Sequence, residues 1–212
     1  MSGVNPITAF CANMPELLEG NAAMNVLIVF DHPRRKSLSG AVLDQFAEGL
    51  EEAGHTTEIA DLHSEKFDPR MPLTDEPDLS GGTKTYSETV LREQARVERN
   101  NAVTFIFPVW WWSVPAMTKG WIDRVWNAGW AYGKKKLTLD RALLVGLAAT
   151  GAASFQKRGY TSAMETQLLV GVMNFCGIKN ARLELLHDTL EGDKERQALL
   201  VKAKQLGQTF AD

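Results

Sequence analysis

The stretch MNVLIVFDHPRRKSLSG, residues 24–40, decides the fold of this chain. Its first seven residues form an apolar run rich in branched side chains, and the turn-forming residues DHP end it. Such a run is typical of a strand buried on both faces. The next segment, AVLDQFAEGLEEAG at 41–54, spaces its apolar residues as a helix does and closes on Gly54. The stretch therefore predicts a strand, a polar loop and a helix in succession.

The same alternation of strand and helix continues to the end of the chain. The pattern predicts strands over 24–30, 55–62, 102–110, 141–150 and 179–189, and helices over 41–54, 84–100, 115–127, 162–177 and 192–210. The Pro- and Asp-rich segment 67–82 is predicted to be a loop. Five such alternations indicate an α/β fold, a doubly wound five-stranded parallel sheet of order 2-1-3-4-5. We expect one domain over 24–212, with residues 1–23 either an appended arm or an extension from an upstream start codon.

Composition excludes several classes of function. The formal net charge of −3 over 212 residues argues against a nucleic-acid-binding surface. No apolar run is long enough to span a membrane, and the first twenty residues lack the features of a signal peptide. The two cysteines, Cys11 and Cys176, form no metal-ligand spacing with the four histidines. We expect reduced thiols, no metal and a cytoplasmic location.

The loop DHPRRKSLSG follows the first strand and meets the start of a helix. Backbone N–H groups and the helix dipole favour an anion at such a point. His32 and the basic residues 34–36 add positive charge, and Ser37, Leu38 and Ser39 open the helix with two hydroxyl groups. These features fit a bound phosphate. The alternative is a solvated basic turn with a serine N-cap.

The segment FPVWWWSVPAMTKGWIDRVWNAGWAYG, residues 107–133, holds all six tryptophans of the chain. Neighbouring side chains diverge, so 110–112 cannot all face one core, and some of these indoles are expected to line a crevice that suits a planar ligand. Trp121 and Trp126 fall on the following helix, and we expect them to pack in the core. Core packing and a partner interface are the alternatives for the whole cluster.

The third loop, ATGAAS, follows the fourth strand. Small residues let the backbone approach a ligand, and Thr150, Gly151 and Ala152 could offer N–H groups to an oxygen that gains negative charge. Taken alone, this segment also fits a short structural connection. Together, the three loops suit a phosphorylated planar cofactor such as flavin mononucleotide or the flavin half of FAD.

The motif FP-x-x-W-x-x-x-P-x-x-x-K-x-W-x-[DE]-[RK]-V, the DHP that follows strand one and the GWAYG at 129–133 resemble the flavodoxin-like NAD(P)H:quinone oxidoreductases. This family includes the animal DT-diaphorases and short bacterial relatives that assist potassium efflux systems. The resemblance covers residues from 24 to about 210. It implies that flavin is bound by His32, Ser37, Leu38, Ser39, Pro108, Val109, Trp110, Trp111, Trp112, Thr150, Gly151 and Ala152. It also implies a homodimer with the active site at the subunit interface.

Two residues are expected to take part in catalysis. The backbone near Trp111 would face the flavin N5, and Tyr160 is the candidate for a phenol that faces the substrate. Animal members carry a Tyr and a His after strand four, whereas here no histidine lies between His63 and His187. The predicted reaction is ping-pong transfer of a hydride from NAD(P)H through flavin N5 to a quinone or a similar acceptor, with FMN favoured over FAD.

Three other functions remain open at this point. A regulatory flavoprotein subunit of a membrane transport system would bind its partner with negligible turnover. A flavodoxin-type electron carrier would have a Thr/Ser-Gly-rich first loop, which DHPRRKSLSG is not. A flavin-free adaptor would use the tryptophans for an interface.

Overall fold

The computed structural model describes residues 22–79 and 84–212. One five-stranded sheet lies at its centre, with all neighbouring strands parallel and in the order β2-β1-β3-β4-β5. The strands are β1 Asn25–Phe30, β2 Thr56–Asp61, β3 Ala102–Pro108, β4 Arg141–Leu147 and β5 Asn180–Leu186. The predicted α/β class and strand order are therefore confirmed.

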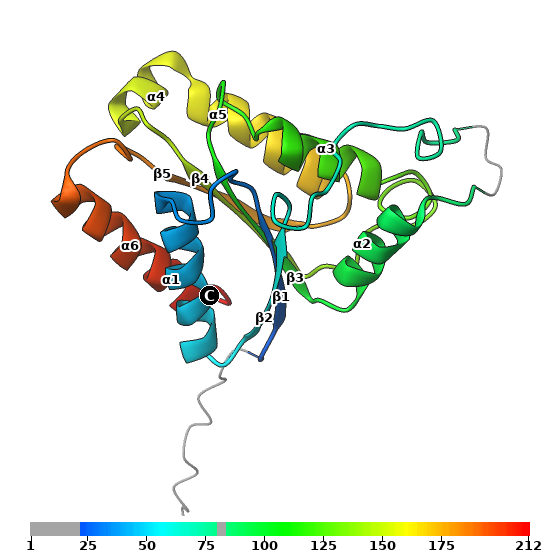
Figure 1. Cartoon of the computed structure of the whole chain (residues 1–212), viewed down its shortest axis with the longest axis horizontal. Coiled ribbons are helices and arrows are strands. Elements are labelled where there is room, and N and C mark those ends of the chain that lie inside the picture. The colour runs from blue at the N-terminus through cyan, green and yellow to red at the C-terminus, as the bar shows by residue number, and fades with distance from the viewer. Residues whose placement is uncertain (1–21, 80–83) are drawn as a thin grey trace, which may run out of the picture.

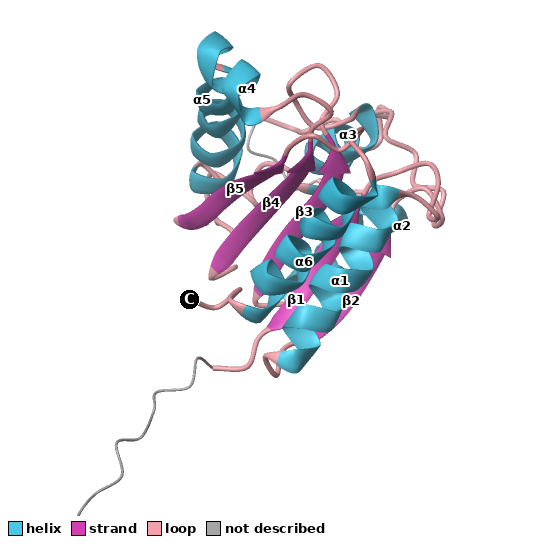
Figure 2. Ribbon diagram, turned by 90° about the vertical axis from the view of Figure 1, so that its left-hand side faces the viewer, coloured by secondary structure: helices cyan, strands magenta, loops and turns pink. Residues whose placement is uncertain are grey.

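Helices cover both faces of this sheet (Figure 1). One face carries α1 Leu38–Glu52 and α6 Asp193–Gln208. The other carries α2 Glu88–Glu98, α3 Ala116–Val125, α4 Ala152–Arg158, α5 Tyr160–Glu165 and the π-helix η1 Thr166–Asn174. Figure 2 shows α1 and α6 lying side by side along the strands.

The apolar run of β1 is continuous because both of its faces are covered. Leu27 and Val29 belong to the core beneath α2 and α3, whereas Val26, Ile28 and Phe30 belong to the core beneath α1 and α6. Successive side chains of a strand point to opposite faces, so a strand between two helical layers needs an apolar residue at every position.

Two glycines allow α1 and α6 to pack closely. A Cβ atom at Gly207 would lie 2.3 Å from the carbonyl oxygen of Phe46, and one at Gly49 would lie 2.1 Å from that of Lys204. No side chain fits at either position unless the helices separate.

The predicted helix over 162–177 is present, but it begins two residues earlier, at Tyr160, ends at Asn174 and is a π-helix over its last nine residues. Helical structure already begins with α4, reverses at Gly159 with φ of +69°, and continues through α5 into the π-helix η1. Small and polar residues before Gly159 hide α4 from a search for apolar periodicity. The predicted strands over 102–110 and 141–150 end earlier, at Pro108 and Leu147. The predicted arm lies outside the described residues apart from its last two.

Candidate active site

A cleft of about 600 Å³ opens at the carboxyl edge of the sheet. It lies where the strand order reverses between β1 and β3, which is the usual ligand position in doubly wound sheets. Seven of the predicted cofactor-binding residues line it: His32, Ser37, Leu38, Ser39, Pro108, Val109 and Trp110. The structure therefore brings the first two predicted loops together around one cavity.

The first loop presents polar groups to the cleft. Ser37 caps α1, because its Oγ accepts a hydrogen bond of 3.2 Å from the N–H of Gly40. The N–H groups of Leu38 and Ser39 lie in the first turn, where a helix offers no internal partner. Nδ1 of His32 lies 3.0 Å from the N–H and 2.9 Å from the carbonyl oxygen of Arg34, which leaves Nε2 for a ligand.

Two arginines line the cleft, and sequence reasoning missed one of them. Arg34 comes from the first loop, and Arg196 comes from the first turns of α6. Arg196 lies 164 residues after His32 in the sequence, so no local pattern connects the two. Arg35 is held elsewhere, because its guanidinium bonds to Asp44 and to the carbonyl oxygen of Gly40.

A fully buried carboxylate joins the first loop to α3. Asp31 accepts hydrogen bonds from the N–H of Thr118 at 2.8 Å and from its Oγ1 at 2.6 Å. Its other oxygen lies 2.9 Å from Nε2 of His63. Thr118 is in the first turn of α3, so Asp31 caps this helix from another loop. This contact fixes the spacing of the two loops that form the cleft.

The tryptophan loop is a tight turn in a costly conformation. Trp110 and Ser113 exchange backbone hydrogen bonds of 3.2 and 3.1 Å, and the two residues between them, Trp111 and Trp112, have φ of +52° and +54°. Positive φ at both central residues is typical of a type I′ turn, which normally contains Asn or Gly. The turn separates the three indoles: Trp110 lines the cleft, while Trp111 is 87% exposed.

Tyr160 lies next to this turn. Its ring stacks on Trp112 with centroids 4.2 Å apart and an angle of 28° between the planes, and it meets Phe155 edge-on at 5.7 Å. Trp121 and Trp126 are buried and pack on Phe105, in agreement with the expected core role.

The third predicted loop lies beside the cleft, which it lines only through Ala149. Thr150 and Ala152 are exposed, and Gly151 precedes α4. Nδ1 of His187 lies 2.9 Å from the carbonyl oxygen of Thr150, and the imidazole packs edge-on against Phe155 at 4.8 Å. From the sequence, only the segment after strand four was considered for a histidine at this site. His187 was therefore missed, because it follows the neighbouring strand β5.

A family model described by its flavodoxin-like fold matches residues 24–209. The chain belongs to this flavodoxin-like family. Several of its relatives carry the names of oxidoreductases. It is 34% identical over 172 residues to an uncharacterized NAD(P)H oxidoreductase, YcaK of Escherichia coli, with 80% of this chain and 87% of that protein covered.

Two further relatives of this flavodoxin-like protein carry related names. A ribosyldihydronicotinamide dehydrogenase [quinone] of Mus musculus is 29% identical over 209 residues, which cover 87% of this chain and 90% of that one. The solved structure of an NAD(P)H:quinone oxidoreductase from Methanothermobacter marburgensis is 34% identical, with a TM-score of 0.84 and coverage of 89% and 96%. The expected family and enzyme class are thereby confirmed: the flavodoxin-like chain is an enzyme of the NAD(P)H oxidoreductase type.

Residues 22–79 and 84–212 hold no group of three His, Cys, Asp or Glu side chains arranged to bind a metal ion. Among the helices of this flavodoxin-like protein that the structure describes, none has the length and apolar character needed to cross a membrane.

Proposed function

We propose that this oxidoreductase binds a flavin in the cleft between β1 and β3, FMN ahead of FAD, and uses NAD(P)H to reduce a quinone or a similar small acceptor. The observation that supports this most directly is the pairing of chemistries within one cavity of about 600 Å³. Cationic and N–H donor groups lie at one side of it, and Pro108, Val109 and Trp110 line another.

The donor set suits a phosphate. Ser39 and the first-turn N–H groups of α1 would hold its oxygens, and Arg34 and Arg196 would balance its charge. Nε2 of His32 is the remaining donor, since Arg34 already occupies Nδ1. A flavin phosphate therefore fits the residues that are present.

The apolar side suits a flat ring. The backbone from Pro108 to Trp110 would lie along its edge, and the bond from Val109 N–H to the carbonyl of Leu147, at 2.8 Å, keeps that backbone fixed against β4. Thr150 would reach the ring from the third loop, and the contact between His187 and the Thr150 carbonyl would position it. Bound there, flavin would supply the two-electron chemistry, and NAD(P)H and the acceptor would use the same site in ping-pong order.

The protein's own contribution is binding, orientation and exclusion of water. Trp111 would offer its backbone at the ring edge, and Tyr160, held by Trp112, would present its phenol to the substrate. Two exposed apolar side chains, Val170 of η1 and Phe175 just after it, suit the second subunit of a homodimer. We expect such an enzyme to work in the cytoplasm.

The first test is an absorbance spectrum of the purified protein, with mass analysis of whatever heat releases. We expect flavin bands that NAD(P)H bleaches and a quinone restores, and the released mass distinguishes FMN from FAD. A protein that is colourless and takes up neither flavin on reconstitution would refute the proposal.

The phosphate side has a sharper test. In the Arg34→Gln/Arg196→Gln variant, we expect FMN to bind about tenfold or more weakly, because charge-assisted bonds to its phosphate are lost. Riboflavin, which lacks the phosphate, serves as the internal control and should bind about as it does to the unchanged protein. Equal losses for both ligands would contradict the assignment of these arginines.

A further inference from the structure

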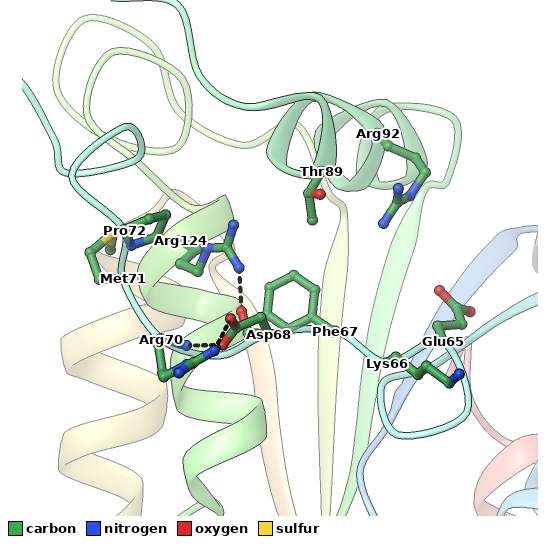
Figure 3. Close-up of a pocket in the computed structure, with 10 residues that line it drawn as sticks. All are labelled: Glu65, Lys66, Phe67, Asp68, Arg70, Met71, Pro72, Thr89, Arg92 and Arg124. Atoms are coloured by element: carbon green, nitrogen blue, oxygen red, sulfur yellow. Dashed lines mark hydrogen bonds and ion pairs between the residues drawn. The ribbon is translucent and has the colours of Figure 1, made fainter.

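A second cavity, of about 610 Å³, lies between the loop after β2 and the helices α2 and α3. It shares no lining residue with the cleft, so it is a separate site within the described residues. Figure 3 shows Thr89 and Arg92 extending from α2 over the ring of Phe67, with Arg124 of α3 across from them.

Cationic side chains predominate in this cavity. Four of them face two carboxylates: Lys66, Arg70, Arg92 and Arg124 against Glu65 and Asp68. Both carboxylates already have partners. Asp68 accepts two bonds from Arg70, at 2.9 and 2.8 Å, and Glu65 accepts two from Arg96, at 2.8 and 3.2 Å. Neither is free to neutralise the remaining cations.

Arg124 forms the buried wall of the cavity. It is 5% exposed, and its guanidinium bonds to Asp75 at 2.7 Å and to the backbone carbonyl of Asp68. Its Nε–H has no hydrogen-bond partner among the residues that the structure describes. A buried donor without a partner is uncommon, and nearby negative charge would reduce its cost.

Two cations in the lining lack a strong partner. Arg92 lies 3.4 Å from an oxygen of Glu93, a carboxylate that also accepts a bond of 3.1 Å from Trp121. Lys66 has no ion pair within the described ranges. The lining therefore has an excess of two positive charges in a chain whose net charge is −3.

The start of α2 adds uncharged donors. Ser87 caps this helix through Val90, so the N–H of Thr89 lies in the first turn without an internal partner. Thr89 and Arg92 are three residues apart and therefore lie on one face of the helix. The hydroxyl-bearing side chain of Thr89 and the guanidinium of Arg92 thus line the same cavity, near the positive end of the helix dipole.

We propose that this cavity is a second ligand site, which binds a phosphate group through Lys66, Thr89 and Arg92. The ligand is either inorganic phosphate or a small organic phosphate, whose apolar part would rest against Phe67, Met71 and Pro72. The inference is independent of the proposed flavin, because the two cavities have no lining residue in common.

The test is a titration of the full-length ¹⁵N-labelled protein, in its FMN-reconstituted form, at constant ionic strength. Inorganic phosphate and AMP are added in separate series, and the backbone amides of Thr89, Arg92 and Ser39 are followed by NMR. We expect saturable shifts at Thr89 and Arg92 and little change at Ser39. Tighter binding of AMP would identify an organic phosphate as the ligand, and equal binding would identify phosphate itself.

A charge-matched pair of variants makes the test specific. In Lys66→Gln/Arg92→Gln we expect binding to weaken about tenfold or more, since two charge-assisted contacts are lost. Lys134→Gln/Lys135→Gln removes the same charge from exposed positions outside the cavity and should change binding less than about twofold. Circular dichroism checks that both variants fold. Shifts confined to Ser39, shifts that never saturate, or equal losses in both variants would overturn the proposal.

Discussion

Replacing Thr118 by valine tests whether the buried carboxylate of Asp31 holds the two walls of the cleft together. Valine has nearly the same shape as threonine but lacks the hydroxyl that donates to Asp31 at 2.6 Å. The backbone N–H of residue 118 and the imidazole of His63 remain as partners. The change therefore deletes one of three hydrogen bonds to a fully buried charge and little else.

The expected loss follows from the charge and burial of the acceptor. A hydrogen bond to a charged group contributes about 1.5–3 kcal/mol, so the unfolding constant should rise by roughly ten- to a hundredfold. With a urea dependence of about 2 kcal/mol/M, the unfolding midpoint should fall by about 1 M. Urea titration of the flavin-free protein measures this, and coincident circular dichroism and fluorescence transitions justify the two-state treatment.

The control is Thr57→Val, a half-buried strand position whose hydroxyl has no hydrogen bond in the described structure. It should stay within about 0.5 kcal/mol of the unchanged protein. In an Asp31→Ala background, Thr118→Val should be neutral or stabilising, because the hydroxyl would otherwise be buried without an acceptor. A loss below about 0.5 kcal/mol for Thr118→Val in the otherwise unchanged chain would refute the idea that Asp31 holds the two walls of the cleft together.

Three further changes probe other parts of the fold. Burial and then the charge of Arg141 lower the pKa of His55. The neutral imidazole therefore contributes stability to the folded state above pH 6.5, and this contribution is lost as the pH falls through the lowered pKa. The urea midpoint should drop from pH 7 to pH 5, and an NMR titration that gives His55 a pKa of 6.5 or more would contradict this. Burial raises the pKa of Cys176 to about 11. In a Cys11→Ser background, this thiol should therefore react slowly with Ellman's reagent at pH 8, and the reaction should become faster only as urea unfolds the protein. Rapid reaction in the folded state would be inconsistent with the burial of Cys176. In thermal melts, Gly207→Ala should destabilise the folded protein by about 1–3 kcal/mol. Gly171→Ala should not, because the nearest atom to a Cβ at that position would be 3.4 Å away. Equal melting temperatures for the two variants would show that α1 and α6 are not closely packed.

The strands were predictable because their signal is local. Continuous apolar runs mark β1, β3 and β4, and the structure covers each on both faces with helices. Strand order also followed from local evidence, since the alternation of strands and helices leaves few ways to wind a five-stranded parallel sheet. Helix α4 was missed for the converse reason: within AASFQKR only Phe155 is buried.

The contacts that shape the site were not predictable in the same way. Asp31 and Thr118 are 87 residues apart, and His187 reaches Thr150 across 37. Each of these four residues also fits an ordinary local role, as a turn, helix or strand-end residue. The neighbouring sequence therefore does not indicate which distant residue each one contacts in the folded protein. Only the register of the sheet, which aligns the ends of neighbouring strands, brings them together.

The tryptophan turn departs from the residue preferences of tight turns, and this departure points to a function. Two consecutive residues with positive φ cost about 1–3 kcal/mol each unless they are glycine or asparagine, yet this chain places Trp111 and Trp112 there. Burial does not compensate the first of them, because Trp111 is 87% exposed, with its ring in a T-shaped contact with that of Trp112 at 5.9 Å. The second gains a stacked contact with Tyr160. A costly backbone with an exposed indole at the mouth of a cleft is better explained by binding than by folding, and this directs the search for ligand and partner contacts to the outer side of the turn.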